Sequence, residues 1–565
     1  MINSWSRSAG DFLSPQTAEK AGIIEVRLGS AAPAPYSPAF VWPSSPPIVS
    51  LEYDSRKVKP FSLYFALPGL HVDGHDYISD AINRGAAAVV YERELSEYPE
   101  RIQAGADYSE KILYIRVKSS RFAMSPLADA FYNHPSRRMK IIGVTGTEGK
   151  STTVYLIYQL LKLLGKKTGF ISTVQQGDGL EEKWNSEHQT TPEAVTIHRL
   201  LAEMLENGAE FAVLESSSHG LSKRTNRLGD VDFDVGVMTN VTHEHLEFHG
   251  TWEQYRSDKA ELFRALDSSP SLHEKQGPSG KFHVHSFGVA NADDPSAAFF
   301  AAATLHKTYT FSTKGAGADL SLRLMESSAG GNWYEVLVAS TGSTVTLRDQ
   351  LPGAFNTGNV LAALLVASNL LGIGIEELAP LVSYLKPVRG RMTAVRRGQP
   401  FEVLVDYAHT PASFETVFPP LRERLNASGG RLISLFGSAG ERDTQKRNLQ
   451  GEIAARFSDI MILTDEDPRG EDPMAILEDI AQGCETASGC EADQGCETDN
   501  MIRDKTLFLI PDRPAAIRHA FSLARPGDLV LLLGKGHENS IIYASGTRPY
   551  DEIGEAEKAL AEAGY

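Results

Sequence analysis

The stretch IIGVTGTEGKSTT, residues 141–153, joins an apolar run to a glycine-rich turn and then to a helical pattern. Gly146 and Gly149 let backbone N–H groups curl around an anion, and the start of the helix adds the positive end of its dipole. Lys150 adds a full charge, and the Ser151 hydroxyl is a ligand that Mg2+ accepts. Although the first glycine of the strict pattern GxxxxGK(S/T) is missing, this order of elements predicts a nucleotide phosphate site rather than an ordinary strand-to-helix turn.

The composition bounds the classes of function. A chain of 565 residues should hold roughly three or four domains. Its 42% hydrophobic and 22% charged residues are ordinary for a globular protein. The net charge of -17 argues against a large sequence-independent nucleic-acid footprint, which needs a basic face. We therefore expect no nucleic-acid partner, while a small anionic ligand held by local lysines and arginines stays compatible.

The sequence shows no segment that targets or anchors the chain to a membrane. No run approaches the roughly 18 apolar residues that a spanning helix needs, and the N-terminus lacks a basic start followed by an apolar core. We therefore expect a cytoplasmic protein without a membrane partner, and we expect a monomer.

The three cysteines, Cys484, Cys490 and Cys496, lie in the six-residue repeats GCETAS, GCEADQ and GCETDN. Their spacing matches no zinc pattern, and no histidine accompanies them. The repeat therefore predicts a low-complexity surface insertion over residues 478–500 rather than a metal site.

The alternation of short apolar runs with helical patterns predicts an α/β protein of three domains. Six prolines between Pro33 and Pro47 predict an irregular segment over residues 1–48, so that regular structure begins near Ser50. The expected domains are a small mixed α/β N-terminal domain, a central P-loop ATPase-like parallel sheet domain and a C-terminal Rossmann-like domain, over residues 49–138, 139–386 and 387–565. Within the central domain, residues 282–351 are less regular and suggest an antiparallel elaboration.

The C-terminal block lacks a GxGxxG turn, so we do not expect it to bind a dinucleotide. Ligands of such sheets bind beyond the carboxyl ends of the strands. The polar residues that follow its expected strands are therefore candidates for chemistry, in the segments 406–409, 437–443, 465–469 and 534–538.

Two further polar clusters follow strands of the central block. Glu215 ends the run FAVLE, where a second Mg2+ ligand opposite Ser151 is needed, although the serines after it also suit a helix cap. The next strand is followed by three histidines and two glutamates within residues 243–249. Such density suggests metal or phosphate chemistry, and the alternative is a solvated loop.

In this order, the motifs resemble the ATP-binding domain of the Mur ligases, which form amide bonds in peptidoglycan precursor synthesis. The motifs are GVTGTEGKST, TTPE at 190–193, ESSSHGL and TNVTHEHLEFHGTWEQYRSDKAELF. The later motifs resemble the UDP-N-acetylmuramoyl-tripeptide synthetases, the MurE type: PGAFNTGN, GRM, DYAHTP, FGSAGERD, TDEDPRGE and GKGHE. The resemblance covers the chain from about residue 50 to its end.

The resemblance implies an ATP-dependent acid–amino-acid ligase. Such an enzyme adds a diamino acid to the D-glutamate of UDP-N-acetylmuramoyl-L-Ala-D-Glu through an acyl phosphate. We expect meso-diaminopimelate, with L-lysine or L-ornithine as alternatives. A folylpolyglutamate-synthase-like ligase and a nucleotide-binding module that forms no amide bond are the competing hypotheses.

The resemblance also assigns the residues of the nucleotide site. The ATP phosphates would be held by Gly146, Thr147, Glu148, Gly149, Lys150, Ser151 and Thr152, with Asn359 at the adenine. Arg391 and Asp406 would reach the nucleotide from the third domain when the domains close. The catalytic set would be Lys150, Glu215, His245, Lys259 and Asp406.

Two Mg2+ ions are implied in the same way. Ser151 and Glu215 would bind one of them, and His245 and Lys259 would bind the other. In this family the matching lysine is carbamylated by CO2, which turns a cation into a carboxylate. Without the resemblance, Lys259 is expected to be a solvated helix residue.

For the UDP-muramyl dipeptide, the resemblance implies Ser55, His71, Thr190, Thr191, Ser217 and Arg227. Because LSKRTNRL is about two residues longer than the family pattern, either Arg224 or Arg227 fits, and we favour Arg227. For the incoming diamino acid, the resemblance implies Arg442, Glu466, Asp467, Pro468, Arg469, Gly534 and Glu538.

Two departures from the family pattern affect these assignments. The usual TNGK is TEGK, which places the acid Glu148 beside the phosphates, where a negative charge is unfavourable unless it points away. The usual DNPR is EDPR, with Glu466 and Asp467 in place of Asp and Asn. Arg469 resembles the diaminopimelate-adding members, whereas the altered acids leave lysine and ornithine open.

Overall fold

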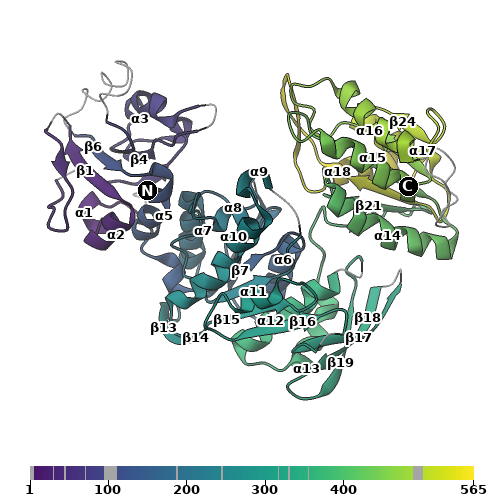
Figure 1. Cartoon of the computed structure of the whole chain (residues 1–565), viewed down its shortest axis with the longest axis horizontal. Helices are drawn as coiled ribbons and strands as arrows, with labels where there is room; N and C mark the ends of the chain where they lie inside the picture. Colours follow the sequence, from purple (N-terminus) through teal and green to yellow (C-terminus); the bar gives the residue numbers. More distant parts are fainter. Residues whose placement is uncertain are drawn as a thin grey trace. The chain divides into compact units, whose positions relative to one another are not determined.

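The computed structural model describes residues 5–29, 31–43, 46–69, 72–94, 111–185, 189–242, 246–315, 317–328, 331–353, 356–487 and 501–565. The chain forms two compact units, Met1–Asp349 with Phe355–Leu385, and Gln350–Ala354 with Lys386–Tyr565 (Figure 1). The first unit contains an N-terminal sheet and a separate central sheet, and the second unit is built on a third sheet. This organisation confirms the expected three-domain α/β architecture.

The N-terminal sheet has the strand order β2-β1-β6-β5-β4-β3. Its strands are β1 (Ile23–Leu28), β2 (Ala34–Pro35), β3 (Ser50–Glu52), β4 (Ser62–Phe65), β5 (Ala88–Tyr91) and β6 (Leu113–Val117). Strands β3 to β6 are parallel, whereas β1 pairs antiparallel with β6. Its helices are α1 (Ala9–Phe12), α2 (Pro15–Lys20), η1 (Ser55–Lys57), η2 (Gly74–Tyr77), α3 (Ile78–Asn83), α5 (Ser120–Phe131) and η4 (Pro135–Arg138).

The irregular segment expected before Ser50 is wrong for residues 9–28, which form α1, α2 and β1 (Figure 1). The side chain of Ser14 accepts a hydrogen bond from the backbone N–H of Thr17, and Pro15 occupies the first turn of α2, where a missing N–H costs nothing. Phe12 is buried and meets Phe131 edge to face, with ring centroids 5.4 Å apart. The run of six prolines begins at Pro33, after β1, so the proline-rich composition describes only the later part of the segment.

The central sheet has the strand order β10-β9-β8-β11-β7-β12-β15-β16-β17-β18-β19. The strands are β7 (Lys140–Thr145), β8 (Thr168–Ile171), β9 (Gln175–Gly177), β10 (Glu182–Trp184), β11 (Phe211–Glu215), β12 (Val235–Met238), β15 (Phe287–Asn291), β16 (Thr308–Ser312), β17 (Leu320–Ser328), β18 (Gly331–Val338) and β19 (Ser343–Asp349). Strand β7 pairs in parallel with β11 on one side and β12 on the other. The carboxyl ends of these three strands therefore meet at one edge of the sheet.

The helices of the central part are α6 (Lys150–Leu163), α7 (Ala194–Glu206), α8 (Ser218–Leu221), α9 (Leu246–His249), α10 (Trp252–Ala265), η5 (Leu266–Ser268), α11 (Ala297–Ala301), α12 (Asn356–Leu371), α13 (Ile375–Leu378) and η6 (Ala379–Tyr384). A separate hairpin joins β13 (Leu272–Gly277) to β14 (Gly280–His285). The antiparallel elaboration expected over 282–351 is right for β17, β18 and β19. It is wrong for β15 and β16, which extend the parallel sheet: β15 pairs in parallel with β12, and β16 pairs in parallel with β15.

The third sheet has the order β20-β21-β25-β22-β23-β24 and is parallel except for β20. The strands of the second unit are β20 (Thr393–Ala394), β21 (Glu402–Asp406), β22 (Leu432–Phe436), β23 (Ile460–Leu463), β24 (Leu507–Leu509), β25 (Leu529–Leu533), β26 (Ser540–Tyr543) and β27 (Gly546–Pro549). Its helices are α14 (Pro411–Ser428), α15 (Gln445–Phe457), α16 (Pro473–Ala487), α17 (Arg513–Leu523) and α18 (Glu552–Glu562). As expected, the polar segments after β21, β22, β23 and β25 lie at the carboxyl ends of parallel strands.

The surface insertion expected over residues 478–500 is wrong for its first ten residues, which belong to helix α16. Cys484 is fully buried in the core of the second unit, and this burial raises the pKa of its thiol to about 12. The apolar side chains around it in sequence, such as Ile480, carry the helical period that the repeat obscured. Cys490 and Cys496 lie outside the described residues.

Helices α15 and α16 pack closely at Gly451, so we expect Gly451→Ala to destabilise the second unit. A Cβ atom at this position would lie 2.1 Å from the carbonyl oxygen of Ile480 and 3.1 Å from the sulfur of Cys484. Overpacking of this kind costs about 1–3 kcal/mol of unfolding free energy. Thermal unfolding should show a lower Tm for this variant and an unchanged Tm for the control Glu452→Ala, since Glu452 is exposed. Equal Tm values for the two variants would contradict the tight contact.

In the described part of the chain, no single helix is long and apolar enough to cross a membrane. The bent pair Asn356–Leu371 and Ile375–Tyr384, with a bend of 118°, passes the same test by length and composition only.

Candidate functional site

The loop between β7 and α6 depends on two glycines. Gly146 has φ +154°, and a Cβ atom there would lie 1.9 Å from the hydroxyl oxygen of Thr239. Gly149 has φ +80° and precedes the first residue of α6, where a Cβ atom would lie 2.6 Å from the amide oxygen of Asn359. The turn therefore needs glycine at both positions, and it leaves the N-terminus of α6 open to an anion.

The acid that departs from the family pattern, Glu148, has an exposed side chain. Its backbone is held in place: the N–H of Glu148 donates to the amide oxygen of Asn240 (2.8 Å), and the Thr239 hydroxyl donates to the Glu148 carbonyl (2.6 Å). An exposed carboxylate keeps its hydration, so the negative charge is tolerated beside a phosphate loop. Residues 239 and 240 directly follow β12, and sequence reasoning missed their part in shaping the loop.

Lys150 and Ser151 occupy the first turn of α6, where they were expected. The ammonium of Lys150 donates to the carbonyl of Thr147 (2.7 Å), so the lysine folds over the loop. The Ser151 hydroxyl donates to the carboxylate of Glu215 (2.9 Å), and both side chains are buried. Thr152 is half-buried one residue further along the helix. A hydroxyl and a carboxylate oxygen so placed are the hard oxygen donors that Mg2+ prefers.

Lys259 is buried in α10 and is not the solvated helix residue expected from its local sequence. Its Nζ atom donates to the carbonyl of Gly146 (2.5 Å) and lies 4.4 Å from the centre of the Tyr255 ring. The Tyr255 hydroxyl is in turn 3.1 Å from the hydroxyl of Thr147. The side chain of Lys259 therefore contacts the glycine-rich loop after β7, although α10 lies far from this loop in the sequence.

The other expected metal ligand, His245, lies outside the described residues. Within the ranges described, no three His, Cys, Asp or Glu side chains come together in a way that could hold a metal ion. His249, from the same dense segment, is buried and bonds to Asp258 (2.7 Å) and to the Ser218 hydroxyl (3.0 Å). Its two ring nitrogens are therefore engaged by protein groups.

Three residues expected to bind the muramyl dipeptide meet at the end of β11. The Thr191 hydroxyl donates to the Glu215 carbonyl (2.9 Å) and accepts from the Ser217 N–H (3.0 Å). Arg227 donates to the Thr191 carbonyl (2.8 Å). Arg224, the alternative, instead donates to the Phe248 carbonyl (2.6 Å). Thr190 is half-buried beside Thr191 in the chain.

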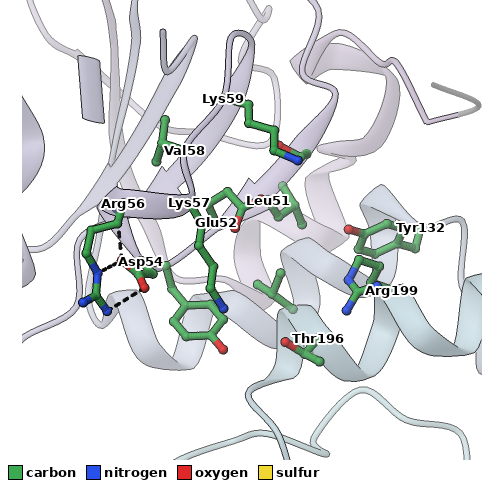
Figure 2. Close-up of a pocket in the computed structure, with 13 residues that line it drawn as sticks. Leu51, Glu52, Asp54, Arg56, Lys57, Val58, Lys59, Tyr132, Thr196 and Arg199 are labelled. Carbon is green, nitrogen blue, oxygen red and sulfur yellow. Dashed lines mark hydrogen bonds and ion pairs between the residues drawn. The ribbon is translucent and has the colours of Figure 1, made fainter. Parts of the chain in front are cut away.

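A pocket of about 370 Å³ is lined on one side by β3 and the residues that follow it (Figure 2). Its other side is formed by α7 and by Tyr132, directly after α5. Ser55 is adjacent in sequence to its lining but is not part of it, and His71 lies outside the described residues. Figure 2 shows Arg56 paired with Asp54, and Arg199 beside Tyr132. The lining residues are Ser50, Leu51, Glu52, Tyr53, Asp54, Arg56, Lys57, Val58, Lys59, Tyr132, Val195, Thr196 and Arg199. Burial raises the pKa of the Glu52 carboxyl group.

Asn359, expected at the adenine, lies in the first turns of α12 against the phosphate loop. Its amide oxygen accepts from the Thr153 hydroxyl (3.1 Å), and its amide nitrogen donates to Asn356 (3.0 Å). In the second unit, Asp406 is buried and accepts hydrogen bonds from the N–H groups of Met392 and Ala408, both at 2.7 Å. Burial raises the pKa of Asp406, and the Arg391 guanidinium lies 4.8 Å from the centre of the Tyr407 ring.

The residues expected to bind the diamino acid gather at the carboxyl edge of the third sheet. The buried ammonium of Lys535 bridges two carboxylates, Asp467 (3.0 Å) and Glu538 (2.5 Å). Asp467 also accepts from the N–H of Ile542 (2.9 Å). Lys535 was not among the expected site residues, although it lies inside the motif GKGHE.

Glu466 and Arg469 lie on either side of Asp467 in the sequence. Glu466 is buried, burial raises its pKa, and its Oε2 atom has no hydrogen-bond partner among the residues described. Gly534, with φ +97°, leaves room for it, since a Cβ atom there would lie 3.2 Å from that oxygen. Arg469 has φ +57°, and its buried Nε atom likewise lacks a described partner. Pro468 is buried between them in the chain, whereas Arg442 is exposed.

Comparison with known proteins gives consistent matches along the chain. Family models match in order: the Mur ligase family catalytic domain at 47–132, the Mur ligase middle domain at 144–367 and the Mur ligase glutamate ligase domain at 390–536. The UDP-N-acetylmuramyl-tripeptide synthetase of Treponema pallidum is 50% identical over 91% of this chain and 93% of its own length. The chain belongs to the Mur ligase family.

Two further Mur ligases extend the comparison. The UDP-N-acetylmuramoyl-L-alanyl-D-glutamate–2,6-diaminopimelate ligase of Geobacillus thermodenitrificans is 36% identical, over 92% of this chain and 96% of its own length. A solved structure of a ligase with the same printed activity is 26% identical with a TM-score of 0.57, covering 94% of this chain and 98% of the other. The expected family is thus confirmed: the chain is an ATP-dependent ligase of peptidoglycan synthesis, and Mur ligases use ATP and Mg2+.

Proposed function

We propose that this Mur ligase joins a diamino acid to the D-glutamate of UDP-N-acetylmuramoyl-L-Ala-D-Glu. ATP would phosphorylate the side-chain carboxylate of the D-glutamate, and the amine would attack the acyl phosphate to give the amide, ADP and phosphate. The contact between Ser151 and Glu215 at the end of the phosphate loop carries this proposal. It supplies oxygen ligands for Mg2+ beside a lysine that folds over the loop.

The protein groups in this mechanism mainly bind and orient. Residues 146–152 would hold the ATP phosphates through backbone N–H groups and the start of α6, and Asn359 would contact the adenine. Lys150 would stabilise the negative charge that builds on the transferring phosphoryl group. The two proposed Mg2+ ions would neutralise more of this charge. Ser151 and Glu215 would bind one of these ions. Arg391 and Asp406 are proposed to contact the nucleotide.

We propose that Lys259 acts as a carbamate that, with His245, binds the second Mg2+. A neutral amine adds to CO2 and loses a proton, which replaces a cation by an oxygen ligand. The burial of Lys259 and the approach of its Nζ atom to the Gly146 carbonyl support the assignment, because they bring the side chain to the phosphate loop.

We propose that Thr190, Thr191, Ser217 and Arg227 bind the muramyl dipeptide, with its uridine part at Ser55 and His71. The convergence of Thr191, Ser217 and Arg227 at the end of β11 supports this, since Glu215 ends the same strand.

The change of sheet between β6 and β7 and between β19 and β20 supports domain boundaries near residues 138 and 386. The N-terminal domain then begins before α1.

We propose meso-diaminopimelate as the diamino acid, with Arg442 and Arg469 at its carboxylates and Gly534 and Glu538 at its distal amine. The buried Nε atom of Arg469 supports a carboxylate ligand, since it lacks a described partner. L-lysine or L-ornithine, which shares the distal amine but lacks the second carboxylate, is the second candidate. Lys535 is already paired with two acids, and the Oε2 atom of Glu466 has no described partner, which suits an ammonium group.

Phosphate release from the purified protein tests the reaction. We expect release only when ATP, UDP-N-acetylmuramoyl-L-Ala-D-Glu and a diamino acid are all present. Release that needs a folate and glutamate instead would support the folylpolyglutamate-synthase-like alternative. Absence of any release with the complete mixture would support a nucleotide-binding module that forms no amide bond.

A substrate panel with the variant Asp467→Asn tests the choice of diamino acid. We expect meso-diaminopimelate to give a higher kcat/KM than L-lysine or L-ornithine. Because the substitution removes a negative charge beside the proposed carboxylate site, the ratio of kcat/KM for diaminopimelate to that for lysine should rise about tenfold. Asp479→Asn is the control, since Asp479 pairs with Arg447 on α15. An unchanged ratio in Asp467→Asn would contradict a role of Asp467 in selection.

A further inference from the structure

A charged bridge joins the N-terminal domain to the proposed acceptor site. Glu193 directly precedes α7, and its Oε1 atom accepts from Arg121 of α5 (2.9 Å) and from Arg227 (2.9 Å). Arg227 also donates to the carbonyl of Thr191 (2.8 Å). The position of the Arg227 guanidinium thus depends on a carboxylate that a second arginine shares.

The bridge is mostly shielded from water. The side chains of Glu193, Arg227 and Arg121 are 7%, 14% and 29% exposed. The Oε2 atom of Glu193 and the Nε atom of Arg227 are buried without a hydrogen-bond partner in the described ranges. Two guanidinium groups on one carboxylate leave a net positive charge of one, which favours an anionic ligand.

Because Oε2 has no hydrogen-bond partner among the described residues, the hydrogen bonds that orient the Glu193 carboxylate are those from the two arginines. If Arg121 is removed, the carboxylate can rotate about its terminal torsion, which has a broad energy minimum. Arg227 then loses the partner that holds it in line with Thr191. The net positive charge of the cluster also falls to zero.

We propose that Arg121 is a positioning residue for acceptor binding, which acts through Glu193 to hold Arg227 against Thr191. The ligand recognised is the anionic UDP-muramyl dipeptide, so this inference rests on the proposed function. In this proposal the N-terminal domain contributes to the acceptor site through Arg121 of α5, in addition to any contact that it makes with the uridine.

The packing of α5 on α7 does not depend on this bridge. Apolar residues of both helices share one buried core, which includes Ala123, Leu127 and Val195. Further polar contacts cross the same boundary: Asn226 donates to the Phe122 carbonyl (3.1 Å), and the Ser125 hydroxyl accepts from the Asp230 N–H (3.2 Å). Loss of Arg121 should therefore leave the fold intact.

Steady-state kinetics of Arg121→Ala test the proposal. We expect the KM for UDP-N-acetylmuramoyl-L-Ala-D-Glu to rise about tenfold, the loss typical of one charged hydrogen-bonded partner. The KM for ATP should stay within about twofold, since the phosphate loop is untouched, and the Tm should change little. Arg121→Lys, which keeps the charge and one donor, should recover part of the affinity for the acceptor.

The matched control is Lys20→Ala. Lys20 pairs with Asp230 (3.2 Å) and so also links the N-terminal part to the central part, but it does not touch Glu193 or Arg227. Its KM for the acceptor should equal that of the wild type. An equal rise in Lys20→Ala and Arg121→Ala would overturn the proposal in favour of a general loosening of the two domains.

A double-variant comparison tests the route through Glu193. Glu193→Gln should raise the KM for the acceptor, and adding Arg121→Ala to it should raise it little further, because the two residues act in series. Additive effects, or an unchanged acceptor KM in Arg121→Ala, would overturn the proposal. A wild-type protein that releases no phosphate with the acceptor would instead refute the proposed function itself.

Discussion

Replacement of Lys150 by alanine is expected to abolish ligation, with kcat lower by a factor of at least about 10³. The lysine ammonium is the fixed cation of the phosphate loop: it starts α6 and folds back onto the Thr147 carbonyl. Without it, the proposed site loses a cation that would stabilise the charge developing on the transferring phosphoryl group. Phosphate release with saturating ATP, acceptor and diamino acid measures the effect.

Lys162→Ala is the control for this variant, because Lys162 lies on the same helix but is 60% exposed and pairs with Glu182. Exposed ion pairs contribute little to stability, so this variant should keep its activity and its Tm. Substantial phosphate release by Lys150→Ala would contradict the assignment of the loop. A large loss in both variants would mean that α6 itself had been disturbed.

Replacement of Lys259 by alanine is expected to remove nearly all activity, and added short carboxylates such as formate or acetate should restore part of it. In the proposed enzyme the side chain carries a carbamate, so a small carboxylate in the space left by the alanine can replace the lost oxygen ligand. The buried position beside the Gly146 carbonyl makes that space specific. Activity should be measured against carboxylate concentration at fixed Mg2+.

Lys223→Ala is the control, since Lys223 is 80% exposed and pairs with Glu261 of the same helix α10. This variant should resemble the wild type and should not respond to formate or acetate. If Lys259→Ala behaves like the wild type, the carbamate proposal fails. If it is inactive and no carboxylate restores it, Lys259 serves only to hold the loop through Gly146.

The strongest local signals in the sequence correspond to real elements. Residues 141–153 form the expected strand, turn and helix, because each of these elements is set by residues that are close together in the sequence. Glu215 could be paired with Ser151 from the order of strands, since the carboxyl ends of adjacent parallel strands meet at one edge. The polar segments of the third sheet follow the same rule.

Two expectations are wrong in regions where one composition spans both regular elements and turns. The prolines from residue 33 onward obscured α1, α2 and β1, whose buried residues share one core with α5, a helix that comes about a hundred residues later in the sequence. The cysteine repeat obscured the end of α16, where Cys484 is buried because Gly451 lets α15 approach. In both regions, contacts between distant segments override a local pattern of turn-forming or repetitive residues.

The sequence by itself determined the family, the α/β class and the strand, turn and helix of residues 141–153, because these depend on short patterns whose periodicity and spacing are local. Only the tertiary structure decided that Lys259 reaches Gly146 and that Glu148 stays exposed on a backbone held by Thr239 and Asn240. It alone joined Arg121 to Arg227 through Glu193. These contacts join residues that lie from 34 to 113 positions apart, and burial sets their energies once the sheet has brought them together.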